Sequence, residues 1–165
     1  MPFIDKYGQG IGDKSPTLPE QLNDIRQRAV ALLARREHAY FELKLKLVAK
    51  GFDVELIAVV LDKLVSEQLL SDYRFAENYV RYRVGKGYGP FRIRSELQER
   101  RVDERIISEY LAGDWGWFEL AAEVKRRRFG ITPPVDTAMC AKQQRFLQYR
   151  GFTSEQINAA LRQED

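Results

Sequence analysis

The residues best suited to chemistry in this sequence are cations that lie among aromatic residues and glycines. Residues 81–94 contain no acidic residue and include five cations, Arg81, Arg83, Lys86, Arg92 and Arg94. Guanidinium groups pair bidentately with carboxylates or phosphates, and an exposed tyrosine such as Tyr88 adds rigid amphipathic contact area. In the alternative interpretation, Tyr79 and Phe91 are core residues and the arginines are only solvated. Because solvation explains five uncompensated cations poorly, we predict that residues 79–94, the basic-aromatic segment, bind a partner.

A second run of cations extends from Lys125 to Arg128. Charge runs on helices are often no more than solvated faces, so both a binding role and a solvated face stay open for this run. We include Arg126 and Arg127 among the residues that could contact a partner or DNA.

Groups that could catalyse a reaction are scarce. His38 is the only histidine and Cys140 the only cysteine, so a metal site and an activated thiolate both lack their usual partners. We expect His38 to cap a helix or to lie at the surface. Gly85, Gly87 and Gly89 follow no strand pattern, and no Gly-Lys-Ser/Thr signature closes them, so a nucleotide-binding loop is only weakly indicated. We therefore predict a protein that is not an enzyme and that needs no cofactor or metal.

The composition is that of a folded chain without a strong charge bias. The 165 residues are 44% hydrophobic, and Lys and Arg outnumber Asp and Glu by 27 to 24, so the net charge alone identifies no partner. A single cysteine allows no intramolecular disulfide. No apolar run approaches the roughly 18 residues that span a bilayer, and the N-terminal residues lack a secretory pattern. We expect a cytoplasmic monomer that does not enter a membrane.

Positions fifty residues apart carry similar side chains. The apolar series are Leu47, Leu97 and Leu147; Phe52, Val102 and Phe152; Ile57, Ile107 and Ile157; and Leu61, Leu111 and Leu161. A self-similar period of this length is typical of arrays of supersecondary units. A helix-capping residue recurs in the same register, as Asp53, Asp103 and Thr153. The sequence therefore predicts three copies of one small module.

Helical spacing of apolar residues predicts that each module contains three helices. Helices of about a dozen residues are marginal alone, so the three must pack together. No convincing period-two alternation occurs, and the fold class is predicted to be all-α. We place a flexible leader at residues 1–19 and three-helix repeats at residues 20–68, 69–114 and 115–165.

Short strings in all three predicted repeats are typical of one known family. The most diagnostic strings, in the second repeat, are Lys86-Gly87-Tyr88-Gly89-Pro90, Arg92-Ile93-Arg94 and Glu96-Leu97. The first repeat contributes Leu32-Leu33-Ala34-Arg35-Arg36-Glu37-His38, and the third contributes Gln144-Arg145-Phe146-Leu147. On these strings the chain resembles the RecX family, the bacterial regulators of the RecA recombinase, from residue 24 to residue 162. The leader matches nothing characteristic of that family.

The resemblance implies tandem three-helix repeats in an elongated, curved molecule that lies along the groove of the RecA filament on single-stranded DNA. It further implies that the chain inhibits the ATPase and strand-exchange activities of RecA, in DNA recombination, repair and the SOS response, and catalyses nothing itself. A direct nucleic-acid-binding protein is the alternative, because three-helix modules resemble helix-turn-helix units. A scaffold for another helical partner is a third interpretation.

Overall fold

The computed structural model describes residues 15–162, and every regular element within them is an α-helix. The helices are α1 (Leu18–Leu33), α2 (Tyr40–Ala49), α3 (Val54–Ser66), α4 (Asp72–Gly85), α5 (Pro90–Glu99), α6 (Glu104–Leu111), α7 (Trp117–Phe129), α8 (Thr137–Arg150) and α9 (Ser154–Arg162). The prediction of an all-α fold is confirmed. Most of the expected leader lies outside the described residues, and α1 begins at Leu18, directly after its N-cap Thr17.

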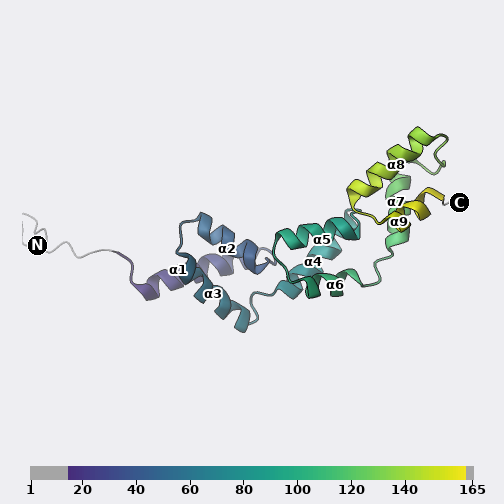
Figure 1. The fold of residues 1–165 in the computed structure, drawn as a ribbon. Helices are drawn as coiled ribbons and strands as arrows, with labels where there is room; N and C mark the ends of the chain where they lie inside the picture. The colour runs from purple at the N-terminus through teal and green to yellow at the C-terminus, as the bar shows by residue number, and fades with distance from the viewer. Residues whose placement is uncertain (1–14, 163–165) are drawn as a thin grey trace, which may run out of the picture.

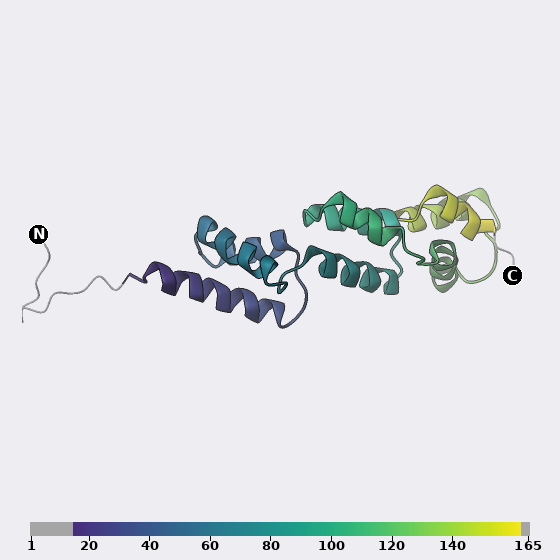
Figure 2. The ribbon, with the colours of Figure 1, turned by 90° about the horizontal axis from the view of Figure 1, so that it is seen from below.

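The helices form three successive groups of three, which follow one another in a row (Figure 1). The row is elongated in both views (Figures 1 and 2), and in Figure 1 the third group turns away from the line of the first two. The chain is thus an elongated and curved array of three repeats, as expected.

Each repeat has its own hydrophobic core. The isoleucines of the fifty-residue series occupy three different cores and are almost completely buried, with Ile57 and Ile107 at 0% exposure and Ile157 at 1%. Leu47, Leu97 and Leu147 are likewise at 0%. The repeat in the sequence is therefore a repeat in the packing.

The last helix of each repeat is capped as the sequence predicts. Asp53 accepts hydrogen bonds from the backbone N–H groups of Glu55 and Leu56 at 2.9 and 3.1 Å, and Asp103 accepts one from Arg105 N at 2.8 Å. In the third repeat the capping box is reciprocal. Thr153 N donates to Gln156 Oε1 at 2.9 Å, and Gln156 N donates to Thr153 Oγ1 at 3.2 Å. These bonds satisfy N–H groups that the helix itself leaves unpaired.

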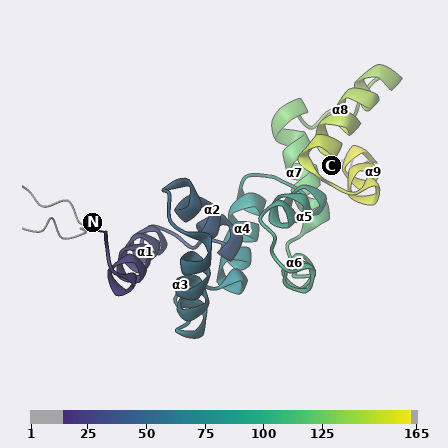
Figure 3. The ribbon, with the colours of Figure 1, turned by 60° about the vertical axis from the view of Figure 1, so that its left-hand side comes forward.

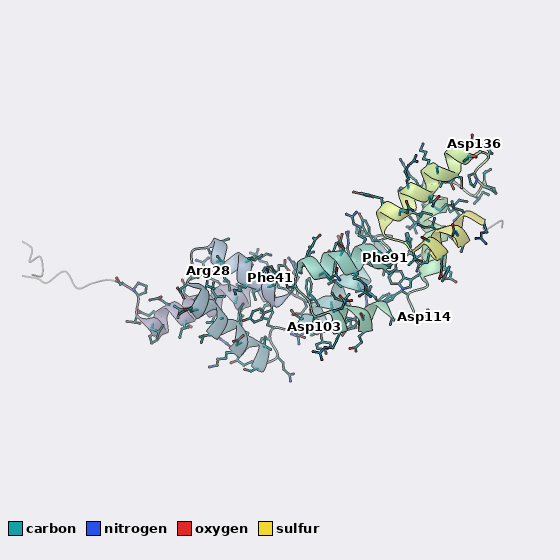
Figure 4. All side chains as sticks on the ribbon, viewed as in Figure 1. Arg28, Phe41, Phe91, Asp103, Asp114 and Asp136 are labelled. Carbon is teal, nitrogen blue, oxygen red and sulfur yellow. The ribbon has the colours of Figure 1, made fainter. Side chains whose placement is uncertain are left out.

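The turn before each capped helix passes through a left-handed residue. Gly51 and Gly151 have φ of +88° and +94°, and the equivalent Arg101 has φ of +54°. A side chain in this conformation costs about 1–2 kcal/mol. The Arg101 guanidinium lies 4.3 Å from the ring centroid of Phe41 in the first repeat, a cation–π contact that offsets part of this cost. Phe41 marks the place where the first two repeats meet (Figure 4).

Side chains and one buried connection join the first repeat to the second. Ala39, in the segment between α1 and α2, is completely buried in the core of the second repeat. Tyr40 N donates to Asp72 Oδ1 at 2.8 Å, and Arg74 pairs with Glu37 at 2.8 Å. The first joint thus combines apolar burial with an ion pair and a backbone-to-side-chain bond.

The expectation that His38 caps a helix or lies at the surface is wrong, because its ring is buried and its partner Arg36 lies beyond the end of α1. The His38 side chain is buried, with 2% exposure, Nδ1 lies 3.0 Å from the carbonyl oxygen of Arg36, and Nε2 lies 3.0 Å from Lys46 Nζ. A ring that donates through Nδ1 and accepts from an ammonium through Nε2 is neutral. Burial lowers the pKa of His38, which favours the same neutral form. His38 therefore has a structural role within the first repeat, where it ties the segment before α2 to Lys46.

Truncation of the repeat isoleucines tests the three-core architecture. Changing Ile57, Ile107 or Ile157 to Ala should each cost about 2–5 kcal/mol, because each change leaves a cavity in a packed core. Native-state hydrogen exchange should localise each loss mainly to the repeat that carries the change. Val59→Ala, at a position of α3 that is 58% exposed, is the matched control and should change stability by less than about 0.5 kcal/mol. An equal loss of protection in all three repeats would contradict the separate cores.

Candidate partner interface

The basic-aromatic segment runs from α4 through the α4–α5 turn into α5, and its turn lies against the third repeat. Gly89 N donates to the carbonyl oxygen of Arg150 at 2.8 Å, and Phe91 N donates to that of Gly151 at 2.9 Å. In Figures 1 and 3 the end of α8 and the short connection to α9 lie beside one end of α5, and Phe91 marks the junction in Figure 4. Phe91 is 60% exposed, so it is not the core residue of the alternative interpretation. Part of the predicted binding surface is therefore an internal joint.

Glycines allow the two backbones to meet in this joint. A Cβ atom on Gly89 would lie 2.5–2.6 Å from the backbone of Gly151 and from Phe152 N. A Cβ atom on Gly151, where φ is +94°, would lie 2.4 Å from the N and Cβ atoms of Arg92. Any other residue at either position would push the repeats apart. The glycine-rich turn is explained by this close approach, and no nucleotide is needed to account for it.

The expectation that the five cations of residues 81–94 lack acidic partners is wrong for four of them. The ion pairs are Arg81 with Glu77, Arg83 and Arg92 with Glu96, and Arg94 with Glu104. Glu77 and Glu96 lie just outside the acid-free stretch, each one helical turn from its partner Arg81 or Arg92, and Glu104 comes from α6. A count of acidic residues within the stretch could not detect partners that a helical turn or a second helix brings close.

Glu96 organises the arginines at the joint. Its side chain, 15% exposed, accepts hydrogen bonds from Arg83 Nε at 2.7 Å, Arg92 Nε at 3.1 Å and the Tyr79 hydroxyl at 2.9 Å. Burial acts to raise the pKa of this carboxyl, but the bonds from Arg83, Tyr79 and Arg92 outweigh burial and hold the pKa below its ordinary value. The same site raises the pKa of Tyr79 to about 12, through burial and the bond to Glu96. Glu96 therefore remains ionised and holds both arginines in place.

Tyr88 lies at the centre of the joint and contacts three guanidinium groups. The distances from the ring centroid to the guanidinium carbons are 3.7 Å for Arg83, 5.2 Å for Arg92 and 4.8 Å for Arg150. Contacts of this kind stabilise by about 0.5–2 kcal/mol each, depending on burial. Tyr88 is half-buried. It acts in the joint as a platform for arginines from two repeats.

Lys86 differs from the other cations of the segment. It is exposed, and no carboxylate within residues 15–162 pairs with it; its ammonium lies 5.6 Å from the ring centroid of Tyr82. Lys86 lines an open cleft of about 390 Å³ with three arginines, Arg127, Arg128 and Arg150, and with Gly87, Val124 and Phe146. We call this site the basic cleft.

The cation run of α7 is divided among three environments. Lys125 is buried, with 4% exposure, so it is not part of a solvated face. Arg126 and Arg127 both pair with Glu123. Arg128 is exposed and has no carboxylate partner in the described part of the chain. The run therefore contributes Arg127 and Arg128 to the basic cleft.

The structure brings together only part of the predicted site. Arg83 and Arg92 pair with Glu96 and lie against the ring of Tyr88 at the joint, and Lys86 and Arg127 share the basic cleft. The other three, Arg81, Arg94 and Arg126, form ion pairs outside the cleft. Sequence reasoning missed Arg128 and Arg150 as cleft residues. The signal for Arg150 was present, because Lys50, Arg100 and Arg150 share one position of the fifty-residue register.

Neither a metal centre nor a membrane span is found in the part of the chain that the structure describes. Residues 15–162 contain no cluster of three or more His, Cys, Asp or Glu side chains arranged to ligate a metal. None of their helices is both long enough and apolar enough to cross a bilayer.

Neutralising Glu96 tests the electrostatic network of the joint. Glu96→Gln should destabilise the protein by about 1–2 kcal/mol near pH 7, because it removes the charge from three hydrogen bonds. The folded-state pKa is depressed, so this contribution is complete above the ordinary value of 4.5 and is lost as the pH falls through the folded pKa. The difference in unfolding free energy between parent and variant should therefore shrink below pH 4.5. Glu99→Gln, at an exposed position of α5, is the control; an E96Q penalty that does not change with pH would contradict the account.

Comparison with known proteins identifies the family. Three RecX family models match successive parts of the chain. The first three-helix domain of RecX matches residues 26–64, the second matches residues 71–111 and the third matches residues 118–161. These ranges coincide with the helix groups α1–α3, α4–α6 and α7–α9.

Curated relatives match over most of both chains. The regulatory protein RecX of Halorhodospira halophila is 44% identical over 137 residues, which cover 82% of this chain and 85% of the relative. The RecX protein of Pseudomonas syringae pv. tomato is 46% identical over 141 residues, covering 83% and 89%.

Solved structures show the same fold at lower identity. The crystal structure of RecX from Lactobacillus salivarius superposes with a TM-score of 0.73 at 20% identity and covers 87% of this chain and 96% of that one. Another crystal structure of a regulatory protein RecX gives a TM-score of 0.74 at 24% identity, covering 86% of this chain and 71% of that one. With three family domains in order and relatives of 44–46% identity over most of its length, this chain belongs to the RecX family of regulatory proteins.

Proposed function

We propose that this protein binds the filament that the RecA recombinase forms on single-stranded DNA and inhibits the ATPase and strand-exchange activities of RecA. The observation that carries the proposal is membership of a family whose curated relatives are named regulatory proteins, together with the resemblance described from the sequence. In this role the protein modulates recombination and DNA repair in the cytoplasm as a monomer and catalyses no reaction itself.

The elongated shape supports a partner that is itself a repeating assembly. Helices of about a dozen residues are about 18 Å long, and three repeats in a row present a long surface (Figure 1). A filament offers equivalent contacts at regular intervals, so several repeats can bind at once and the contacts add. Regulation then requires no enclosed pocket, because the surface itself competes for the filament groove.

The second joint, where the α4–α5 turn meets the end of α8, suggests distinct roles for the candidate contact residues. We assign Arg81, Lys86, Arg126 and Arg127 to direct contact, because all four are exposed. Arg83, Tyr88 and Arg92 position the joint through Glu96, and Arg94 ties α5 to α6 through Glu104. The second group acts on the partner mainly through the orientation of the third repeat.

Direct binding of nucleic acid remains the alternative function, and the basic cleft is the observation that favours it. The two functions are compatible, since a recombinase filament carries DNA. The discriminating observation is whether affinity requires the recombinase or whether bare DNA binds with a steep dependence on salt.

Removing three exposed cations tests the proposed contact surface. Changing Arg81, Lys86 and Arg127 together to Ala removes no core atoms, so stability should change by less than about 1 kcal/mol. Inhibition of RecA ATP hydrolysis on single-stranded DNA should weaken tenfold or more, equivalent to about 1.4 kcal/mol of binding energy. The measurement is the concentration of protein that halves the ATPase rate at several salt concentrations.

The matched control removes the same charge from the first repeat, with Arg28, Lys50 and Lys63 changed to Ala at exposed positions. It should inhibit RecA with a half-maximal concentration within about twofold of the parent. Equal inhibition by the parent and the R81A/K86A/R127A variant would show that the contact surface does not lie at the second joint. No inhibition by the parent protein would refute the proposed function itself.

A further inference from the structure

The basic cleft gathers cations that are far apart in the sequence. Lys86 comes from the α4–α5 turn, Arg127 and Arg128 come from α7, and Arg150 is the last residue of α8. A charge run on one helix is commonly a solvated face, but here the cleft forms only because the second and third repeats meet. Like charges that converge in a concave site raise the local positive potential and attract anions.

Internal carboxylates compensate this charge only in part. Of the four cleft cations, only Arg127 pairs with a carboxylate within residues 15–162, that of Glu123. Arg150 is held by a hydrogen bond from its Nη1 to the carbonyl oxygen of Lys86 at 3.0 Å and by the rings of Tyr88 and Phe146, at 4.8 and 5.4 Å. Neither contact neutralises its charge. A preorganised guanidinium beside two cations without acidic partners is suited to an external anion.

We propose that the basic cleft binds a backbone phosphate of single-stranded nucleic acid. The cleft volume of about 390 Å³ lies within the usual range for small-ligand sites. Val124 and Phe146 give the cleft apolar surface beside its cations, which suits a sugar attached to the phosphate. The inference deepens the proposed function, because it names the part of the filament that this joint contacts.

Exposed aromatic residues favour a nucleic-acid strand over an acidic protein segment. Tyr82 is 59% exposed and lies beneath the ammonium of Lys86. Tyr149 precedes Arg150, is 71% exposed, and has the Arg92 guanidinium 4.9 Å from its ring centroid. Proteins that bind single strands combine a basic groove for the backbone with aromatic rings on which bases stack. An acidic peptide would use the cations but has no equivalent use for these rings.

Binding of an oligonucleotide without recombinase tests the cleft. The probe is a fluorescently labelled oligothymidylate of about 16 nucleotides, titrated with the full chain over a range of salt. In the Lys86→Gln, Arg128→Gln double variant, the dissociation constant should rise tenfold or more. The slope of log affinity against log salt should become shallower by about 0.7, because the variant loses the one phosphate contact that the cleft makes. Both positions are exposed, so the fold should be retained, and circular dichroism checks this.

The matched control is Lys63→Gln with Arg105→Gln, two exposed positions outside the cleft, which should leave the dissociation constant within about twofold of the parent. Identical affinity and salt slope for the cleft variant and the control would overturn the proposal. Displacement of the oligonucleotide by polyglutamate at equal charge concentration would overturn it in favour of an acidic protein segment. RecA inhibition is measured in parallel. If the cleft fails while the parent still inhibits RecA, only the cleft proposal falls; if the parent binds the strand through the cleft but does not inhibit RecA, only the proposed function falls.

Discussion

The close approach of Gly89 and Gly151 is the constraint on which the arrangement of the second and third repeats depends. Two backbone hydrogen bonds, from Gly89 and Phe91 to the end of α8, form only if neither glycine carries a side chain. Backbone contacts tolerate little variation in geometry, so the third repeat is fixed in one orientation. That orientation brings Arg127, Arg128 and Arg150 to Lys86, and the basic cleft is its consequence.

Different kinds of interaction hold the two joints of the array. The first buries Ala39 in the neighbouring core and adds the Arg74–Glu37 pair. The second combines backbone contact with stacked guanidinium groups around Tyr88. An ionised Glu96 allows Arg83 and Arg92 to lie against that ring, because it offsets their mutual repulsion. Glu96 thus pairs with Arg83 and Arg92 at the joint, whereas Lys86 and Arg128 have no carboxylate partner in the described residues and remain available at the cleft. Arg150 belongs to both places and connects the packing of the repeats to the proposed function.

The sequence predicted what depends on regular spacing. The fifty-residue register identified Ile57, Ile107 and Ile157 as core residues, and the capping roles of Asp53, Asp103 and Thr153 were evident from residue type and register alone. The failures concern contacts between elements. The pairing of Arg94 with Glu104 and the burial of His38 depend on how helices pack. No local pattern could show that the glycine-rich turn would dock against another repeat, and so the basic-aromatic segment was interpreted as surface when part of it is a joint.

The most direct test of the account is the effect of Gly89→Ala on both shape and inhibition. The distance between spin labels at Ser95→Cys in α5 and Gln144→Cys in α8, in a Cys140→Ser background, reports the orientation of the third repeat. The account predicts that Gly89→Ala shifts or broadens this distance distribution, because the added Cβ collides with Gly151. It also predicts that RecA inhibition weakens tenfold or more while circular dichroism shows the helices intact. Full inhibition by a variant whose repeats have visibly separated would contradict the claim that the joint positions the interacting surface.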